Sequence, residues 1–234
     1  LIFADIETVN KKIDNAKKKL KADKKFAQEV ELFEKIKSTL EDGKSARTIE
    51  FNEEEQEILK DTFLLTMKPI LYIANISEEQ LSNPFEDKNV AQVVEYAKTE
   101  GADVIPLCVK IEEELASLDG EDKKEMLEAL GLEESGLDKV IKASYDLLGL
   151  MSFLTAGEPE VRAWTIKKGT KAPKAAGKIH SDIERGFIRA EIVSYDDLIK
   201  EGSMNAAKEK GLVRSEGKDY IMQEGDIVLF RFNV

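Results

Sequence analysis

The first forty residues carry a regular stripe of apolar side chains, and this stripe restricts the possible folds more than any other feature. Apolar residues recur at alternating steps of four and three, and after one gap the spacing resumes: Ile2, Ile6, Val9, Ile13, Ala16 and Leu20, then Phe26, Val30, Phe33 and Leu40. Such spacing is typical of a coiled-coil helix, whose narrow apolar seam must be buried against a partner. We therefore expect a helix to about Leu40 that packs against a second helix.

The partner helix is expected close by in the sequence. The segment 41–45 contains Gly43 and lets the chain turn back. Asn52 is a suitable N-cap for a helix over Glu53–Leu65, whose acidic first turn favours the positive end of the helix dipole. The sequence therefore predicts an antiparallel coiled-coil hairpin over residues 1–66.

Residues 67–148 alternate between strand and helix patterns. Pro69 precedes an apolar run at 70–74, a helical pattern covers about 90–100, and a second strand pattern covers 103–109. This order predicts a βαβ unit with parallel strands and a right-handed crossover. Two strands are too few for a complete doubly wound domain. We expect the closing portion of a Ras-like α/β nucleotide domain whose earlier strands are missing or lie upstream.

Residues 149–234 show a different texture. Short alternating runs lie between glycine-containing turns, at residues 152–156, 161–166, 187–193 and 227–232. Short strands around one or two short helices predict a small α+β module.

Composition narrows the class of protein. The 234 residues are 42% apolar and 35% charged, which suits a globular chain with a sizeable core. No run approaches the roughly eighteen apolar residues of a membrane span, and the N-terminal segment lacks the basic region of a signal peptide. Cys108 is the only cysteine, in an apolar setting that suits a buried thiol in a reducing compartment. We expect a soluble, cytoplasmic protein that makes no membrane contact.

Charge is distributed unevenly along the chain. The net charge is −12, with −13 over residues 1–148 and +1 over residues 149–234. Residues 161–189 carry eight Lys and Arg against two Asp and Glu, a net of +6, which could dock on nucleic acid. The alternative, favoured on charge alone, is a solvated stretch balanced by neighbouring carboxylates.

Two segments imitate the phosphate-binding motifs of nucleotide hydrolases. Gly43-Lys44-Ser45 resembles the end of a P-loop, but Ser38 stands where the motif needs glycine, and a helix rather than a strand precedes it. The run Leu1–Asp5 resembles a Walker B strand, yet the continuing apolar stripe predicts helix. The chain is therefore expected to lack the phosphate cradle and magnesium ligands of phosphoryl transfer.

The segment Asn75–Glu78 follows the first predicted strand, at the edge where α/β sheets bind ligands. One interpretation is purely structural, because Ser77 and Gln80 can form a capping box while Asn75 satisfies the turn. Another is base recognition, because the segment resembles the GTPase motif Asn-Lys-x-Asp with Ile76 and Glu78 substituted. An Asn amide can pair with the N6 donor and N7 acceptor of adenine.

Two longer segments identify a family. Residues 161–173 and 179–191 resemble the C-terminal TGS domain of the YchF/Obg-like ATPases, and Asn75–Glu78 matches the Asn-x-x-Glu of that family. The resemblance covers nearly the whole chain. The P-loop part of the family has no counterpart in this sequence. The resemblance implies an α/β remnant of a Ras-like P-loop nucleotide domain with an α-helical coiled-coil hairpin, followed by an α+β β-grasp (TGS) domain over residues 149–234.

The resemblance also implies an activity. The full-length parent is expected to be a magnesium-dependent ATPase that associates with ribosomes or RNA, with ATP and Mg²⁺ as its cofactors. The chain alone is expected to be inactive and to require neither. The alternatives are a non-catalytic RNA- or ribosome-binding adaptor that uses the hairpin and the TGS domain, and a scaffold whose coiled coil binds protein.

Four residues are assigned to the nucleotide base by this resemblance. Asn75 is expected at the base edge, Ile76 is expected to pack on the ring, and Glu78 is expected to tune the pocket. Val109 lies in the segment Asp103–Glu112, which resembles the next base-contacting loop of the family.

The last unit interleaves basic residues with Trp164 and His180. The expected RNA or ribosome contacts, without DNA specificity, are Lys167, Lys168, Lys171, Lys174, Arg185 and Arg189. Trp164 could stack a base, although its alternation within a strand predicts a core position. His180 is expected to be a structural residue near Asp182, since one histidine and one cysteine cannot form a zinc site.

Overall fold

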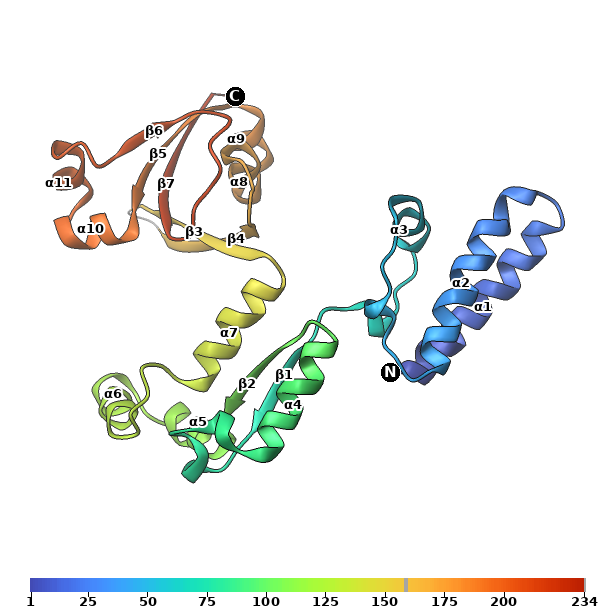
Figure 1. Cartoon of the computed structure of the whole chain (residues 1–234). Helices are drawn as coiled ribbons and strands as arrows, with labels where there is room; N and C mark the ends of the chain where they lie inside the picture. The colour runs from blue at the N-terminus through green and yellow to red at the C-terminus, as the bar shows by residue number, and fades with distance from the viewer. Residues whose placement is uncertain (158–159, 234) are drawn as a thin grey trace. The chain divides into compact units, whose positions relative to one another are not determined.

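The computed structural model describes residues 1–157 and 160–233, coloured along the chain in Figure 1. Its contacts divide the chain into two units, Leu1–Val140 and Ile141–Val234. The first unit therefore contains the predicted hairpin together with most of the predicted nucleotide segment. Within the described ranges, every helix is too short or too polar to cross a membrane.

The first unit begins with a helical hairpin. Helices α1 (Ile2–Leu20) and α2 (Ala27–Glu41) lie side by side and antiparallel, joined by a turn and the short 3-10 helix η1 (Lys24–Phe26) (Figure 1). Their shared seam is built from apolar residues that are each at most 6% exposed: Val9, Ile13, Phe33, Ile36 and Leu40. The apolar stripe thus pairs two helices, as its spacing predicted.

The position of the turn differs from the prediction. We expected one helix to Leu40, a turn at 41–45 and a partner helix at Glu53–Leu65, and this was wrong. The chain reverses at residues 21–26 instead, where five residues separate Leu20 from Phe26 in the apolar stripe. In this turn the Asp23 carboxylate accepts a hydrogen bond from the Lys25 N–H at 3.0 Å. The segment 53–59 forms only the short helix α3 (Glu53–Leu59), which Asn52 caps as expected.

A buried carboxylate attaches the hairpin to the segment that follows it. Residues 1–5 are helical, as the stripe predicted, rather than a Walker B strand. Asp5 is 2% exposed, and its carboxylate accepts hydrogen bonds from the backbone N–H groups of Leu65 at 2.8 Å and Thr66 at 2.7 Å. These two residues open the 3-10 helix η3 (Leu65–Met67), which leads into the first strand.

The predicted βαβ unit is confirmed. Strands β1 (Leu71–Asn75) and β2 (Asp103–Leu107) pair in parallel in a two-stranded sheet, with Leu71 opposite Asp103 and Asn75 opposite Leu107. The connection contains η4 (Glu78–Gln80), η5 (Pro84–Glu86) and α4 (Lys88–Thr99), and β2 is followed by α5 (Val109–Ala116), α6 (Gly120–Ala129) and α7 (Gly136–Leu147).

Glu100, at the end of α4, joins this unit to the base of the hairpin. Its carboxylate accepts hydrogen bonds from the hydroxyl groups of Ser45 and Tyr72, both at 2.6 Å, and pairs with Arg47 at 3.3 Å. Burial raises the pKa of Glu100, but the two hydrogen bonds and the Arg47 charge outweigh burial and lower it. The hydrogen bond to Glu100, with burial, raises the pKa of Tyr72 to about 12.

The second unit is a five-stranded mixed sheet with the order β4-β3-β7-β5-β6. Strands β3 and β7 are parallel, and the other pairs are antiparallel. All four predicted strands are present, and β6 was missed because it is only three residues long. The elements are β3 (Leu150–Ala156), β4 (Val161–Lys167), α8 (Ala172–Ile179), α9 (Ser181–Arg185), β5 (Phe187–Ser194), α10 (Tyr195–Glu201), α11 (Met204–Glu209), β6 (Arg214–Glu216) and β7 (Asp226–Phe232).

An ion-pair cluster links neighbouring strands of this sheet. Glu191 on β5 accepts two hydrogen bonds from Arg231 on β7 and one from Arg189, each at 3.0 Å. The hydrogen bonds from Arg231 and then Arg189 lower the pKa of Glu191 from its ordinary 4.5 to about 2. Its ionised form is therefore stabilised by folding.

We predict that Asp5→Asn destabilises the first unit by about 2 to 3 kcal/mol, because one of two backbone N–H groups would face an amide NH₂ instead of a carboxylate. Urea unfolding followed by far-UV circular dichroism measures the change. Asp14→Asn, an exposed position on the same helix, is the matched control. Equal unfolding midpoints for the two variants would show that the Asp5 contacts do not stabilise the fold.

We predict that the stabilisation by Glu191 is complete above its ordinary pKa of 4.5 and is lost as pH falls toward about 2. Thermal unfolding followed by the fluorescence of Trp164, the single tryptophan, reports on this unit. Wild type should unfold at a higher temperature than Glu191→Gln at neutral pH, and the gap should close between pH 4.5 and 2. The exposed control Glu209→Gln should show no such closing gap. A gap that stays constant with pH contradicts the prediction.

Candidate nucleotide base-binding site

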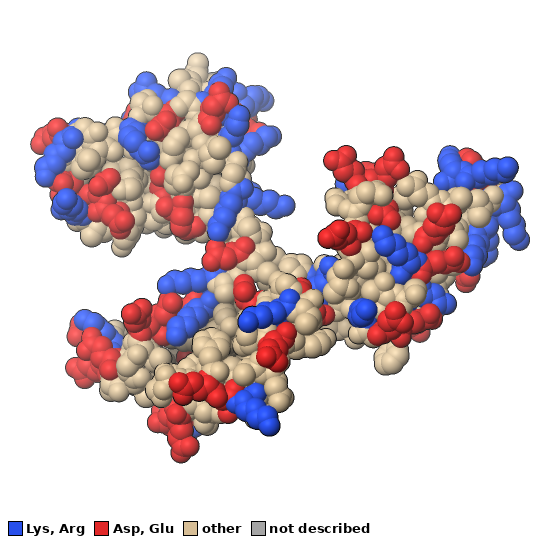
Figure 2. Space-filling model, viewed as in Figure 1, with Lys and Arg blue, Asp and Glu red and all other residues tan. Residues whose placement is uncertain are grey.

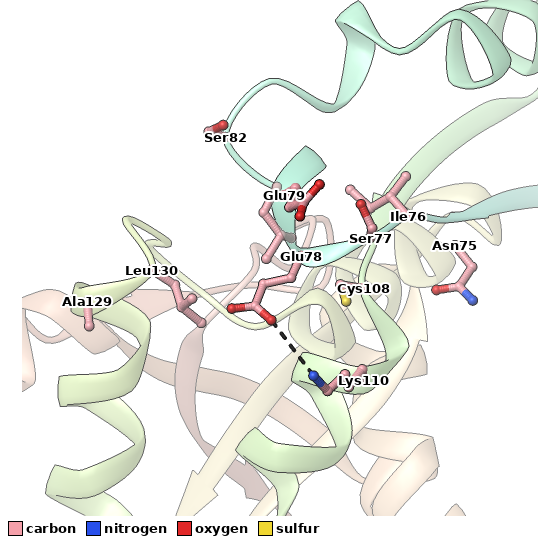
Figure 3. A pocket seen from close by; sticks show the side chains of 11 residues that line it. Asn75, Ile76, Ser77, Glu78, Glu79, Ser82, Cys108, Lys110, Ala129 and Leu130 are labelled. Atoms are coloured by element: carbon pink, nitrogen blue, oxygen red, sulfur yellow. Dashed lines mark ion pairs between the residues drawn. The ribbon is translucent and has the colours of Figure 1, made fainter.

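A pocket lies at the carboxyl ends of β1 and β2. The parallel pairing brings these ends together, and the ladder continues one residue further, where the Ile76 N–H donates to the Leu107 carbonyl at 2.9 Å. The pocket has a volume of about 850 Å³ and is drawn in Figure 3. It is lined by Asn75, Ile76, Ser77, Glu78, Glu79, Leu81, Ser82, Cys108, Lys110, Ala129 and Leu130.

Asn75 connects the two loops that form the pocket. Its Oδ1 accepts a hydrogen bond from the Val109 N–H at 3.2 Å, across the two strand ends. Its Nδ2 has no acceptor within hydrogen-bonding distance among the residues that the structure describes. The amide can therefore donate to a ligand, and the second lone pair of Oδ1 can accept from one. Asn75 stabilises the turn and still retains hydrogen-bonding capacity for a base.

Glu78 and Lys110 face each other across the pocket. The Oε2 atom of Glu78 lies 3.9 Å from Nζ of Lys110, the contact marked by the dashed line in Figure 3. Their side chains are 55% and 71% exposed, so the pair contributes at most about 1 kcal/mol and can rearrange around a ligand. Sequence reasoning did not select Lys110, although it is the second residue of α5, in the loop that was expected to contact the base.

Two apolar residues were also assigned to the base. Ile76 lines the pocket, but it is only 7% exposed and belongs to a buried apolar cluster with Val90, Cys108 and Ile111, so a small part of its side chain is available to a nucleotide ring. Val109 is not among the residues that line the pocket. Its side chain is 52% exposed, and its backbone N–H donates to Oδ1 of Asn75.

The turn that carries Glu78 is fixed by its own residues. Ser77 and Gln80 form the predicted capping box, with the Ser77 N–H donating to Oε1 of Gln80 at 2.8 Å. The Gln80 amide in turn donates to Asp87 at 2.7 Å. Asp87 caps α4 by accepting from the Asn89 and Val90 N–H groups, and the Val90 bond is the largest cause of its lowered pKa. The turn therefore has a defined shape before any ligand binds.

The resemblance implies Mg²⁺ together with the nucleotide. Across residues 1–157 and 160–233, no group of three or more His, Cys, Asp or Glu side chains is placed to hold a metal ion. Proteins usually hold Mg²⁺ through one or two carboxylates together with waters and the phosphates of a nucleotide.

The basic stretch of the second unit is largely neutralised by nearby carboxylates. Of the six expected RNA contacts, only Lys167 has no carboxylate within 4.0 Å among the described residues. The other five form ion pairs: Lys168 with Asp146 at 2.6 Å, Lys171 with Asp219 at 2.7 Å, Lys174 with Glu184 at 2.5 Å, Arg185 with Asp182 at 2.9 Å and Arg189 with Glu191 at 3.0 Å. The excess of +6 in the sequence therefore overstates the free positive charge.

Trp164 and His180 have structural roles. The Trp164 indole N–H donates to Thr155 Oγ1 at 2.9 Å, and the Arg162 guanidinium lies 4.3 Å from the centre of the indole. The ring also packs against the core, so it is not free to stack a base. His180 caps α9 by accepting from the Asp182 N–H at 3.2 Å, which confirms its expected structural role.

The comparisons with known proteins agree with this architecture. The family model YchF-GTPase_C, described as a protein of unknown function (DUF933), matches residues 150–233. The ribosome-binding ATPase YchF of Bacillus subtilis (strain 168) is 56% identical over the whole chain, and Obg-like ATPase 1 of Rattus norvegicus is 44% identical over 90% of it. The chain covers 64% and 54% of the lengths of these two proteins.

A solved structure extends the comparison to the fold. The Schizosaccharomyces pombe YchF GTPase superposes with a TM-score of 0.79 and is 34% identical, with 98% of this chain and 63% of that chain covered. Identity over the whole chain, the match to the C-terminal model and the shared fold agree. The chain therefore belongs to the YchF/Obg-like ATPase family and corresponds to the C-terminal part of these proteins.

Proposed function

We propose that this chain is the base-recognising and C-terminal part of an ATPase, and that the pocket at Asn75–Glu78 holds the adenine of ATP. The observation that carries the proposal is the placement of Asn75. Asn75 is the last residue of β1, at the carboxyl edge of a parallel strand pair. Its Oδ1 accepts a hydrogen bond from the Val109 N–H, and its Nδ2 remains available as a donor.

Adenine fits the hydrogen-bonding groups of this pocket. Its N7 can accept from Nδ2 of Asn75, and its N6 amino group can donate to the second lone pair of Oδ1. Guanine presents the carbonyl O6 in place of that amino group. Its N1 and N2 groups are donors, and they need a carboxylate within hydrogen-bonding distance. Glu78 is one methylene longer than the Asp of the guanine motif and is paired with Lys110. The pocket therefore favours adenine.

The relatives differ in the nucleotide that their names mention. The Bacillus subtilis protein is named an ATPase, whereas the Schizosaccharomyces pombe structure is described as a GTPase. The geometry at Asn75 and Glu78 supports ATP for this chain. Hydrolysis belongs to the full-length parent with Mg²⁺. Residues 43–45 form the turn between α2 and the next 3-10 helix, so the chain alone is proposed to be inactive.

Association with ribosomes or RNA in the cytoplasm is the second element of the proposal. It is supported by the name ribosome-binding ATPase given to the Bacillus subtilis and Haemophilus influenzae relatives. The strand order β4-β3-β7-β5-β6 with α8 after the first hairpin supports assigning the second unit as a β-grasp (TGS) domain. Lys167 and its neighbours up to Arg189 remain candidate contacts on that domain. A non-catalytic ribosome-binding adaptor is the alternative.

We predict that Glu78→Asp, in a full-length protein that contains this chain, raises the ratio of GTP affinity to ATP affinity by roughly 10-fold. The shorter carboxylate can accept from guanine N1 and N2, and such a charged hydrogen bond contributes about 1 to 3 kcal/mol. Titration of both nucleotides by isothermal calorimetry measures the ratio. Ile76 is left unchanged, because a lysine there would place a charge in an apolar cluster.

The matched control is Glu95→Asp, an exposed position on α4 outside the pocket. It should leave both affinities unchanged. Asn75→Ala should weaken both nucleotides, because N7 is an acceptor in either base. If Glu78→Asp leaves the affinity ratio at its wild-type value and Asn75→Ala has no effect, Asn75–Glu78 does not contact the base.

A further inference from the structure

The tip of the helical hairpin carries a concentrated positive charge. Residues 11–25 contain eight lysines and two aspartates, a net charge of +6, and they span the end of α1, the turn and η1. Figure 2 shows blue side chains gathered at this end of the α1–α2 hairpin. The hairpin tip, defined here as residues 11–25, is a basic surface on an otherwise acidic unit.

The net charge of residues 1–148 as a whole does not reveal this basic surface. Residues 1–148 have a net charge of −13, but residues 1–10 and 26–148 alone carry 13 Lys and Arg against 32 Asp and Glu, a net of −19. The hairpin tip therefore reverses the sign of the charge locally. The lysines are contiguous in the sequence, and the turn at 21–26 brings Lys17–Lys19 and Lys24–Lys25 to the same end of the hairpin.

Much of this charge is not neutralised within the chain. Lys17 pairs with Glu34 at 2.8 Å, and Lys25 pairs with Asp23 at 3.0 Å. Lys18, Lys21 and Lys24 are exposed, and no carboxylate lies within 4.0 Å of their ammonium groups in the parts of the chain that the structure describes. This differs from the second unit, where five of six candidate lysines and arginines are paired.

Helix stability explains only part of the cluster. Lys17, Lys18 and Lys19 occupy the last turn of α1, where cations favour the negative end of the helix dipole. Lys24 and Lys25 begin η1 just before α2, where a cation is unfavourable by about 0.3 to 1 kcal/mol. Lys25 is accounted for by its ion pair with Asp23 and its position over the Phe26 ring, 5.2 Å from the ring centre, whereas Lys24 has no carboxylate within 4.0 Å among the described residues.

The chemistry of the hairpin tip fits a phosphate backbone. All eight basic residues are lysines, which act as point charges on phosphates and lack the planar fork with which arginine reads guanine. No large apolar side chain is exposed between residues 11 and 26, so the surface of the tip is formed mainly by charged groups. The packed seam of α1 and α2 holds these lysines on a stiff arm.

We propose that the hairpin tip docks on the phosphate backbone of RNA, independently of base sequence, with Lys18, Lys21 and Lys24 as its unpaired contacts. The inference rests on the proposed ribosome association and specifies the surface that makes it. Each phosphate contact releases counterions, which contributes about 0.7 to 0.9 to the slope of log K against log salt. Three lost contacts should flatten the slope by about 2.

The test compares two triple variants of this chain. The tip variant combines Lys18→Gln, Lys21→Gln and Lys24→Gln, and the matched control combines the exposed substitutions Lys44→Gln, Lys98→Gln and Lys124→Gln. Both remove three positive charges. Binding is measured to purified ribosomes by co-sedimentation and to a labelled RNA duplex by fluorescence anisotropy, at several salt concentrations. Circular dichroism confirms that both variants are folded.

The tip variant should bind the RNA duplex roughly 100-fold more weakly than wild type at 0.1 M salt, with the flattened slope, while the control stays near wild type. It should also lose ribosome binding. If wild type and tip variant bind ribosomes equally, the inference is wrong while ribosome association stands. If the wild-type chain binds the RNA duplex through the tip but does not bind ribosomes, the proposed ribosome association is wrong and the inference about the tip stands. If the wild-type chain binds anionic lipid vesicles but does not bind RNA, the inference about the hairpin tip is wrong.

Discussion

The parallel pairing of β1 with β2 is the constraint on which the candidate site depends. It ends both strands at one edge of the sheet, with Asn75 directly opposite Leu107. The turn after β1 and the helix after β2 therefore meet, and the Asn75 side chain bonds to the first residue of that helix. Two antiparallel strands of the same sequence would place Asn75 and Val109 at opposite ends of the sheet. The chemistry of the pocket follows from this pairing.

Two acidic residues, Asp5 and Glu100, determine how the hairpin is attached to that βαβ unit. Asp5 holds the backbone of Leu65 and Thr66 just before β1, and Glu100 contacts Ser45, Arg47 and Tyr72 at the amino end of the same strand. Both carboxylates are satisfied by hydrogen bonds, which offsets the cost of burying them. Strand β1 and the helical hairpin therefore belong to one connected unit.

Much of the fold was predictable from the sequence, because periodicity reports burial. The apolar stripe predicted paired helices, and the runs at 70–74 and 103–109 predicted the parallel strands. The position of the hairpin turn was not predictable, because a break of five residues in the stripe is compatible with one continuous helix when no side-chain contacts are known. The position of Asn75 and Glu78 at the carboxyl end of β1, where both line one pocket, was predictable from the segment that follows the strand pattern. The position of Lys110 and the burial of Ile76 depend on which residues meet in space. The lysine cluster at 11–25 is visible in the sequence, but its position at a hairpin tip is not.

The most direct test of the central claim is a ¹⁵N NMR titration of this chain with adenosine and, separately, with guanosine. The account predicts that adenosine shifts the side-chain amide of Asn75 and the backbone amides of Ser77 and Lys110, that guanosine shifts them less, and that amides of the hairpin tip are unaffected. Shifts that are equal for the two nucleosides, or that occur away from the carboxyl ends of β1 and β2, would contradict the assignment of this pocket to adenine.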